Sequence, residues 1–161
     1  MPRLNLELKT VKKIKNFEEL AASNARRAAL EIAEAGLEAI DTKQAIRAFV
    51  RREDSLLTIG SRTFELNNLG KIVIGGVGKC ALEAADVLED ILGDYISRGV
   101  VLHIAGESQL KRIEAIKGTH PFPSEENIRG AKALVDNVGG LQENDLVIFV
   151  VSGGGSTLLC L

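Results

Sequence analysis

The sequence predicts an α/β domain: a mostly parallel β-sheet with helices on both faces, preceded by a long N-terminal helix. Two observations support this fold class. Short, near-continuous runs of β-branched residues alternate with segments in which apolar residues recur every three or four positions, as in a parallel sheet covered by helices. Two of these runs also end in glycine clusters that lead directly into a helical segment. Residues 1–161 are therefore assigned to a single α/β domain.

The first third of the chain is predicted to be helical. From Phe17 to Ile40, apolar residues recur at three- and four-residue steps, which predicts one long amphipathic helix packed against the sheet. Asp41 or Thr42 provides an N-cap for a second helix that runs to about Arg52. Neither helix is expected to contribute much to the chemistry.

The rest of the chain is predicted to alternate between strands and helices. The predicted strands cover residues 57–59, 63–66, 71–74, 100–105, 112–116 and 146–151, and the predicted helices cover residues 79–92 and the segment that Ser124 caps. A turn at residues 75–78 joins the third strand to its helix. Ligands of parallel sheets bind beyond the carboxyl ends of the strands, and both glycine clusters fall at such ends.

Composition and charge narrow the class of protein. Hydrophobic residues make up 45% of the chain and the net charge is −2, so the bulk charge gives no support for a nucleic-acid partner. The longest apolar runs, Val100–Ala105 and Leu146–Val151, are too short to span a membrane. The segment Met1–Lys15 lacks the apolar stretch of a secretory signal. With only Cys80 and Cys160, far apart in the sequence, the chain is predicted to be a cytoplasmic protein with reduced thiols.

The first candidate binding segment runs from Gly76 to Ala81, where a strand turns into a helix. Gly76 and Gly78 let the backbone approach a ligand, and the helix N-terminus that follows offers N–H groups to an anion. Lys79 adds a cation in the first turn of this helix, where a lysine is unfavourable unless an anion compensates it. The segment lacks the Ser or Thr that a Walker A loop places after its lysine. A dinucleotide pattern does fit Gly76, Gly78 and Ala81, and Glu107 is a candidate ribose-binding acid for that alternative.

The second candidate segment is Ser152-Gly153-Gly154-Gly155-Ser156, which follows the last strand. Three consecutive glycines are costly to order, and a nest of N–H groups around an oxyanion gives a reason for them, with the two serine hydroxyls as further ligands. The alternative is a flexible connector to another domain. A nucleophilic serine finds no support, since no Asp and His partners can be assigned and the motif G-x-S-x-G is absent.

A third segment, from Gly118 to Ser124, is a loop stiffened by two prolines. Thr119 and His120 stand at its start, after a predicted strand, and are candidates for contact with a substrate. His120 could also act as a base or only satisfy neighbouring backbone groups. His103 lies inside an apolar strand and is expected to be a core residue. No set of residues in the sequence indicates a metal site.

These segments, in this order, resemble the glycerate 2-kinase family. Members of that family have a strand followed by G-x-GKA, then an HP-x-P loop before a helix, and then D-L-V followed by SGGGS-x-L. The corresponding residues here are Gly76–Ala81, Thr119–Pro123, Asp145–Val147 and Ser152–Leu158. The HP-x-P and SGGGS pieces are specific in combination, and the resemblance covers nearly the whole chain.

The resemblance implies transfer of the ATP γ-phosphate, with Mg²⁺, to the 2-hydroxyl of D-glycerate. It also implies a Rossmann-like domain with Lys79 as the active-site lysine and Ser152–Ser156 as a ligand-binding loop. The second domain of the family, called MOFRL, is absent from these 161 residues. The chain is thus expected to be the N-terminal domain of a two-domain enzyme, a fragment with weak or no activity by itself. A homo-oligomeric state is left open.

Two points keep other functions in view. Ser124 stands where many members of the family have an aspartate, and Cys80 replaces a small alanine. The dinucleotide pattern leaves an NAD(P)-dependent reductase of the hydroxypyruvate type as the first alternative. A non-catalytic domain that binds sugar phosphates is the second, because such domains also place glycine-rich turns at the ends of strands.

Overall fold

The computed structural model describes residues 12–161, and their contacts divide the chain into two units at Asp41. Part of the Met1–Lys15 segment considered above as a signal lies outside the described residues. The described part of the first unit contains the helices α1 (Phe17–Leu20) and α2 (Asn24–Ala39). The prediction of one long helix is wrong, because Ser23 adopts an extended conformation and its hydroxyl accepts a hydrogen bond from the Arg26 amide at 3.3 Å, which makes it an N-cap.

The first unit is held together around a single buried aromatic ring. Phe17 is 2% exposed, and the Lys12 ammonium lies 3.3 Å from the centre of its ring. The buried Glu34 carboxylate of α2 accepts a hydrogen bond from the Ile14 amide at 3.0 Å and another from the Lys13 amide. Glu34 therefore fixes the segment that precedes α1.

The second unit opens with a helix and a small antiparallel sheet. Helix α3 covers Thr42–Phe49, and the sheet has the order β1 (Val50–Glu53), β2 (Leu56–Ile59) and β3 (Arg62–Glu65). The predicted hairpin of residues 57–66 is confirmed. The predicted extension of the second helix to Arg52 is wrong, because Val50–Glu53 pairs with β2 as an extra strand.

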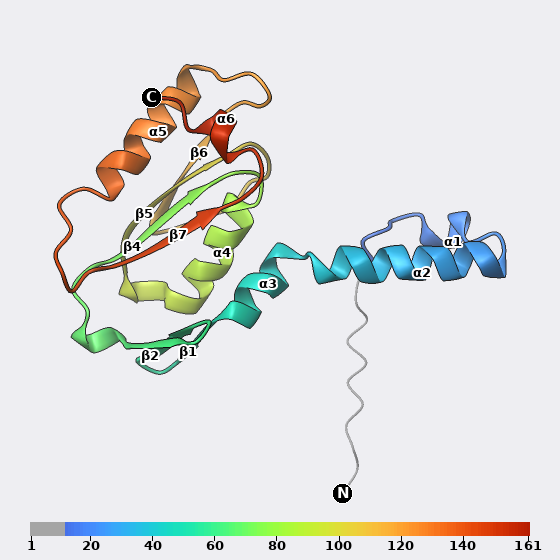
Figure 1. Ribbon diagram of the computed structural model, residues 1–161, viewed down its shortest axis with the longest axis horizontal. Coiled ribbons are helices and arrows are strands. Elements are labelled where there is room, and N and C mark those ends of the chain that lie inside the picture. The colour runs from blue at the N-terminus through green and yellow to red at the C-terminus, as the bar shows by residue number, and fades with distance from the viewer. Residues whose placement is uncertain (1–11) are drawn as a thin grey trace, which may run out of the picture. The chain divides into compact units, whose positions relative to one another are not determined.

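The main sheet of this unit contains four parallel strands in the order β6-β5-β4-β7 (Figure 1). Their bounds are β4 (Ile72–Val77), β5 (Ile96–His103), β6 (Ile113–Lys117) and β7 (Leu146–Val151). Helix α4 (Ala81–Leu92) follows β4, helix α5 (Glu125–Asn137) precedes β7, and the short α6 (Gly155–Leu158) follows β7. Three-residue 3₁₀ turns lie at Leu66–Asn68 and Gly93–Tyr95.

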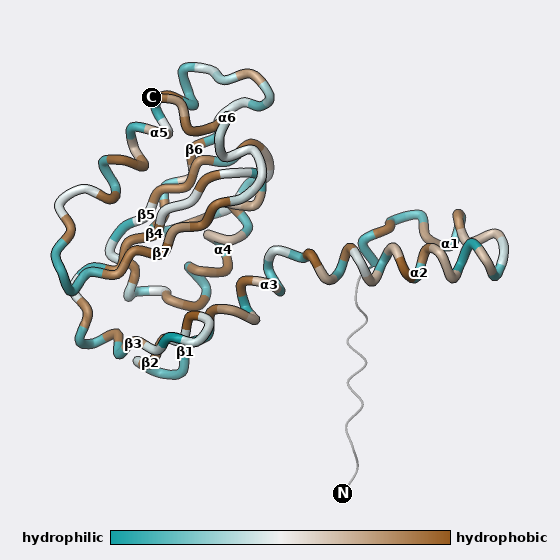
Figure 2. Tube along the Cα trace, in the orientation of Figure 1, coloured by the Kyte–Doolittle hydropathy of each residue, from teal (hydrophilic) through white to brown (hydrophobic). Residues whose placement is uncertain are grey.

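The sheet is covered on both faces, as predicted. The α4 face buries Leu82, Leu88 and Leu92 together with Ile72 and Ile74 of β4. The opposite face buries Leu134 of α5 and Leu158 of α6 against β4, β5 and β6. The hydropathy tube shows this arrangement as hydrophobic strands in the middle of the unit (Figure 2). No helix among residues 12–161 is long and apolar enough to cross a membrane.

The chain changes direction across the sheet between β4 and β7. From β4 it proceeds through α4 to β5 and on to β6, and it then returns through α5 to β7 on the other side of β4. Strands β4 and β7 are in register from Ile72↔Leu146 to Val77↔Val151, so they end at the same edge. A crevice at such a reversal is the usual place for a ligand in an open α/β sheet.

Candidate functional site

The two glycine-rich segments meet at the carboxyl edge of the sheet. The Lys79 amide donates to the Gly153 carbonyl at 2.9 Å, and the Cys80 amide donates to the Ser152 hydroxyl oxygen at 3.0 Å. In the other direction, the Ser152 amide donates to the Val77 carbonyl at 2.9 Å. The predicted convergence of the two turns is therefore confirmed.

Gly78 makes this close approach sterically feasible. Its φ angle is +120°, and a β-carbon added there would lie 2.3 Å from the Ser152 hydroxyl oxygen. Gly76 has a different role from the expected one. β4 continues to Val77, so Gly76 lies buried inside the strand, where a β-carbon would come within 2.9 Å of the Val101 side chain. The predicted turn at residues 75–78 is thus wrong except at Gly78. Gly76 instead allows β4 to pack closely against the Val101 side chain.

The amide hydrogens of the turn that leads into α4 are used within the protein. The Gly78 amide donates to Leu102 at 3.1 Å and the Ala81 amide donates to Gly78 at 3.2 Å, while Lys79 and Cys80 bond to the second loop as described. The amides of residues 78–81 are therefore not available to an anion, whereas the amides of Leu82 and Glu83 in the first turn of α4 have no acceptor within residues 12–161. The second loop supplies the acceptors of two of these amides, Lys79 and Cys80.

The second loop retains donors of its own. Within residues 12–161 no acceptor pairs with the amides of Gly153 and Gly154, whereas the Gly155 amide donates to the Ser152 carbonyl at 3.2 Å. Gly154 has a φ angle of +88°, and no atom lies within 4 Å of the place where a β-carbon of Gly153 would stand. Gly155 is buried at the start of α6, and Ser156 is exposed.

Lys79 and His120 approach this loop from two other elements. A β-carbon added at Gly154 would lie 3.6 Å from Cε of Lys79, 3.4 Å from Cδ2 of His120 and 3.6 Å from Nε2 of His120. Both side chains are exposed, and in the described part of the chain Lys79 forms no salt bridge. The structure thus brings together one residue from each of the three segments that the sequence singled out.

A cavity of about 300 Å³ opens beside Lys79, between the start of α4 and the loop after β5. Asp86 lines this cavity. Its carboxylate accepts hydrogen bonds from the Lys43 ammonium at 2.7 Å and the Ser108 hydroxyl at 3.0 Å. The hydrogen bond from Lys43 is the main cause that lowers the pKa of the Asp86 carboxyl. Glu107, the candidate ribose acid of the dinucleotide alternative, also lines this cavity.

Thr119 is more strongly tied to its own loop than the sequence indicated. Its hydroxyl donates to the Phe122 carbonyl at 2.7 Å, and its amide donates to the Asn127 side-chain oxygen at 2.8 Å. His120 follows directly and precedes a cis peptide bond to Pro121. Asn127, which the sequence reasoning missed, is fully buried on α5. Its position three residues after the Ser124 N-cap is the one signal that pointed to it.

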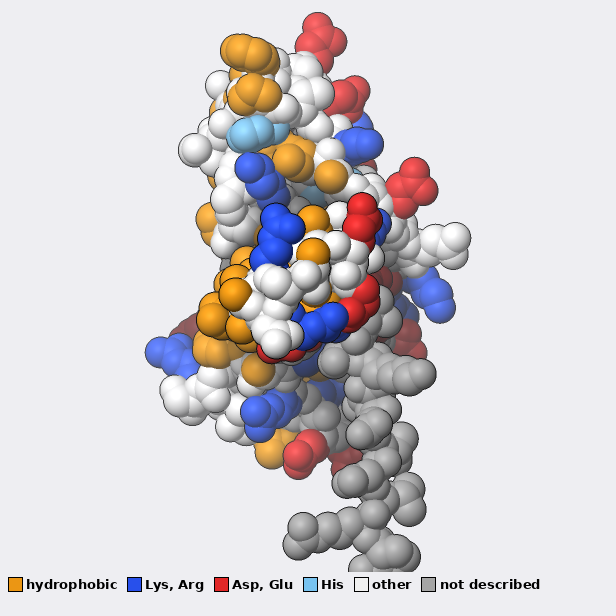
Figure 3. Space-filling view, turned by 90° about the vertical axis from the view of Figure 1, so that its right-hand side faces the viewer, with side chains coloured by type: hydrophobic (Ala, Val, Ile, Leu, Met, Phe, Trp, Pro, Cys, Tyr) orange, Lys and Arg blue, Asp and Glu red, His pale blue; other side chains and the backbone are white. Residues whose placement is uncertain are grey.

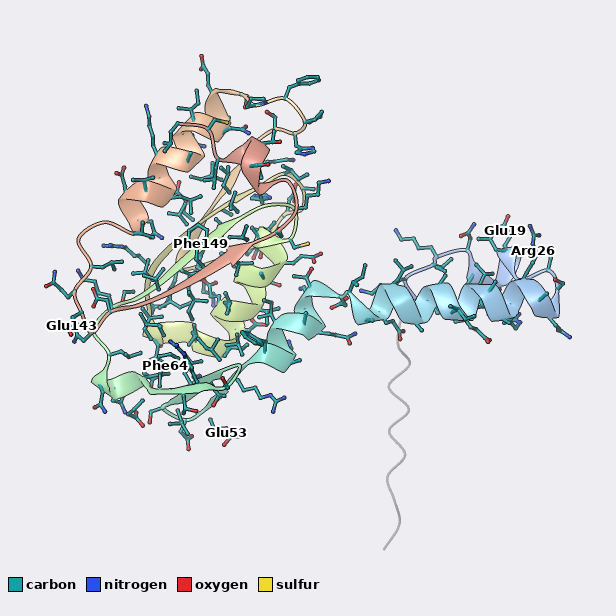
Figure 4. The ribbon with its side chains drawn as sticks, viewed as in Figure 1. Glu19, Arg26, Glu53, Phe64, Glu143 and Phe149 are labelled. Carbon is teal, nitrogen blue, oxygen red and sulfur yellow. The ribbon has the colours of Figure 1, made fainter. Side chains whose placement is uncertain are left out.

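His103 has a structural role, as predicted, and Asp145 has one too. His103 is 4% exposed, and its Nδ1 lies 3.0 Å from the Ala105 carbonyl oxygen. Asp145 lies at the amino edge of the sheet, where its carboxylate accepts hydrogen bonds from the amides of Lys71 at 2.6 Å and Gln142 at 2.9 Å. Figure 4 marks this edge with Glu143, at the opposite end of β7 from α6. Asp145 is therefore remote from the carboxyl-edge loops.

The described residues do not form a metal site. Among residues 12–161, no three His, Cys, Asp or Glu side chains gather closely enough to hold an ion. The Mg²⁺ that the resemblance implies would be held largely by the phosphates of ATP, because proteins bind it through only one or two carboxylates. Cys80 and Cys160 are both free thiols, as expected.

The family model described as "Domain of unknown function (DUF4147)" matches residues 28–161. The chain belongs to this family. It is 34% identical over 140 residues to a "Glycerate 2-kinase" of Pyrococcus horikoshii, with 86% of this chain and 31% of the relative covered. This similarity confirms the resemblance to glycerate 2-kinases that the motifs indicated.

The chain is also similar to a solved glycerate kinase structure and to a relative that has a different name. The crystal structure of a Thermotoga maritima glycerate kinase matches with a TM-score of 0.63 and 30% identity, covering 81% of this chain and 28% of that one. An Agrobacterium vitis protein named "Putative hydroxypyruvate reductase" is 35% identical over 100 residues, covering 58% of this chain and 23% of the relative. The matched part of the chain thus spans between 23% and 31% of the length of these relatives.

Proposed function

We propose that this chain supplies the Lys79 side of the active site of an enzyme that transfers the γ-phosphate of ATP to the 2-hydroxyl of D-glycerate. The observation that carries the proposal is the meeting of the Lys79 ammonium, the His120 ring and the Gly153–Gly154 amides at one edge of the sheet. The names of the glycerate kinase relatives support the choice of acceptor.

The chemistry of phosphoryl transfer suits such an arrangement. Catalysis of this reaction consists mainly of positioning the reactants and neutralising negative charge. The unpaired amides of Gly153 and Gly154 donate to an anionic oxygen, and Lys79, which has no carboxylate partner within residues 12–161, supplies the positive charge. Either a phosphate of ATP or the carboxylate of D-glycerate satisfies this set of donors. His120, which also lies beside Gly154, contacts the same ligand.

The remaining part of the site is provided by a second domain. This chain spans about 31% of the Pyrococcus horikoshii relative, so most of that protein lies outside the part compared. An active site completed by another domain exposes the Lys79 side to water when the chain is alone. The isolated chain accordingly binds its ligand weakly and turns over slowly or not at all, and we place the enzyme in the cytoplasm because both cysteines are free.

A coupled assay of ADP release with ATP and D-glycerate tests this function. The assay compares the 161-residue chain with a protein in which the same chain is joined to the second domain. Phosphorylation of D-glycerate by the joined protein is the expected result, and no phosphorylation of any small hydroxy acid would refute the proposal. Titration with NADH and NADPH separates it from a reductase, since micromolar binding would favour the latter. A sugar phosphate that raises the melting temperature when ATP and D-glycerate do not would favour a binding domain.

A further inference from the structure

The side-chain amide of Asn127 connects three segments around the proposed site. Its Oδ1 accepts a hydrogen bond from the Thr119 amide at 2.8 Å, and its Nδ2 donates to the Thr119 carbonyl at 3.0 Å and to the Thr157 carbonyl at 3.3 Å. The side chain is 0% exposed, so water cannot replace these partners. Asn127 belongs to α5, Thr119 to the loop after β6, and Thr157 to α6.

These bonds exceed what a helix cap requires. The capping box at the start of α5 needs only the mutual bonds between Ser124 and Asn127, and those are present. An asparagine amide has two donor hydrogens, and here both are directed away from the cap, to Thr119 and Thr157. Because Asn127 bonds to both the amide and the carbonyl of Thr119, it fixes the position of the Thr119 backbone.

The next residue along the chain is the one that needs this support. Within residues 12–161 the His120 ring forms no hydrogen bond, so its place beside Gly154 depends on the backbone that carries it. The Thr157 carbonyl, on the other side, belongs to the helical turn that continues directly from Gly153–Ser156. The buried side-chain amide of Asn127 thus bonds both to the Thr119 backbone, which carries His120, and to the helical turn that follows the glycine loop.

We infer that Asn127 is the positioning residue of this site, which holds the His120 ring and the Gly153–Gly155 loop at their mutual distance. The inference rests on the proposed function in taking this edge of the sheet as the ligand site. A site whose supporting residues are loose loses much of its binding and catalytic power even when every contacting group is present.

The experiment compares Asn127→Asp and Asn127→Ala with a matched control on the same helix. Asn137 is also a buried asparagine of α5, at 6% exposure, and its Nδ2 donates to the Ile74 carbonyl at 2.8 Å, inside the sheet. Asn137→Ala therefore removes a comparable buried amide without touching the loops. Asn127→Asp keeps an acceptor for the Ser124 and Thr119 amides but loses both donors, so the cap of α5 survives in that variant.

The readout is the NMR signal of the His120 ring in the full chain, which contains only two histidines. We expect Asn127→Asp and Asn127→Ala to move or broaden the His120 signal without ligand and to weaken the binding of inorganic phosphate about tenfold. Asn137→Ala should lower the melting temperature but leave the His120 signal and the phosphate affinity unchanged.

Different outcomes would overturn the positioning role of Asn127 and the proposed function. An unchanged His120 signal and unchanged phosphate affinity in Asn127→Asp would overturn the positioning role, as would equal effects in Asn137→Ala. If none of phosphate, ATP and D-glycerate moves the His120 signal of the unaltered chain, the proposed function fails. The ligand-free spectra of the variants would still show whether Asn127 holds the ring in place.

Discussion

The Cys80 amide donates a hydrogen bond to the hydroxyl oxygen of Ser152, which lies 72 residues later in the chain. This bond makes Ser152 the cap of α4, because Cys80 is the N-cap residue of that helix and has no capping bond from its own side chain. A helix start that is capped by the neighbouring loop has fewer donors left for a ligand. The anion-binding groups that we propose are the Gly153 and Gly154 amides and the Lys79 ammonium, and the Leu82 and Glu83 amides of α4 are also unpaired within residues 12–161.

Replacing Ser152 by alanine should destabilise the fold by about 1 kcal/mol, because the Cys80 amide loses its acceptor. Urea unfolding monitored by circular dichroism measures this loss. Ser156→Ala is the control: Ser156 is exposed, and its hydroxyl has no partner within residues 12–161. If the two variants unfold at the same urea concentration, Ser152 does not cap α4.

Gly78→Ala should be more damaging than any other substitution in the two loops. Alanine is strained at a φ angle of +120°, and its β-carbon would lie 2.3 Å from the Ser152 hydroxyl oxygen, so we expect a loss of about 3 kcal/mol. Gly153→Ala is the matched control, because its β-carbon meets no atom within 4 Å. Thermal unfolding of both variants tests this, and a Gly78→Ala protein as stable as Gly153→Ala would contradict the observed packing of the loops.

Lys79→Met should leave the melting temperature unchanged and reduce function severely. The side chain is exposed and forms no salt bridge among the described residues, so its removal costs the fold little. In the two-domain protein we expect kcat/KM for D-glycerate to fall by orders of magnitude, because the substitution removes the cation that faces the ligand. Lys132→Met on the exposed surface of α5 is the control. Normal kinetics of Lys79→Met would remove this residue from the site.

We expect the stability of the fold to depend on pH through Asp145, which lies away from the proposed ligand site. The hydrogen bonds from the Lys71 and Gln142 amides hold the pKa of the Asp145 carboxyl below its ordinary value. When the pKa of a carboxyl is lower in the folded than in the unfolded protein, the ionised carboxyl stabilises the fold at pH values above the unfolded-state pKa. This stabilisation is lost as the pH falls through the folded-state pKa. Asp145→Asn should thus melt at a lower temperature than the unaltered chain at pH 6.

The difference between the two proteins should shrink as the pH falls below about 4, where the carboxyl begins to take up its proton. Melting curves between about pH 2.5 and about pH 7, where the carboxyl is fully ionised, would show this convergence. A difference that stays constant over the whole range would mean that the charge of Asp145 does not contribute to stability.

The sheet also leaves a hydrophobic surface along its edge strand. Val147, Phe149 and Val151 alternate along β7 and are 37%, 42% and 72% exposed. Figure 4 shows Phe149 on this strand, and a β-carbon added at Gly75 would collide with its ring at 2.3 Å. Other hydrophobic side chains reach the surface in the view of Figure 3. The alternation arises because α5 lies over β5 and β6 rather than over β7.

Local sequence patterns predicted most elements but not their limits. The amphipathic period of residues 17–40 concealed the Ser23 cap, although serine before a helical run is itself a start signal. Val50–Glu53 continued the period of α3, yet became a strand because pairing with Leu56–Ile59 outweighs a helical preference at the end of a helix. Gly76 looked like part of a turn, and its place inside β4 follows from the neighbouring Val101 of β5.

The sequence by itself determined that an α/β sheet forms and that both glycine clusters follow strands of that sheet, since these facts depend on the period and order of residues along the chain. It also pointed to Lys79 and His120. Only the tertiary structure decided which amides remain unpaired, that Gly78 rather than Gly76 allows the loops to meet, and that Asn127 bonds to both Thr119 and Thr157. Those outcomes depend on hydrogen-bond partners and neighbours far away in the sequence, such as Ser152 for Cys80, and no local pattern contains that information.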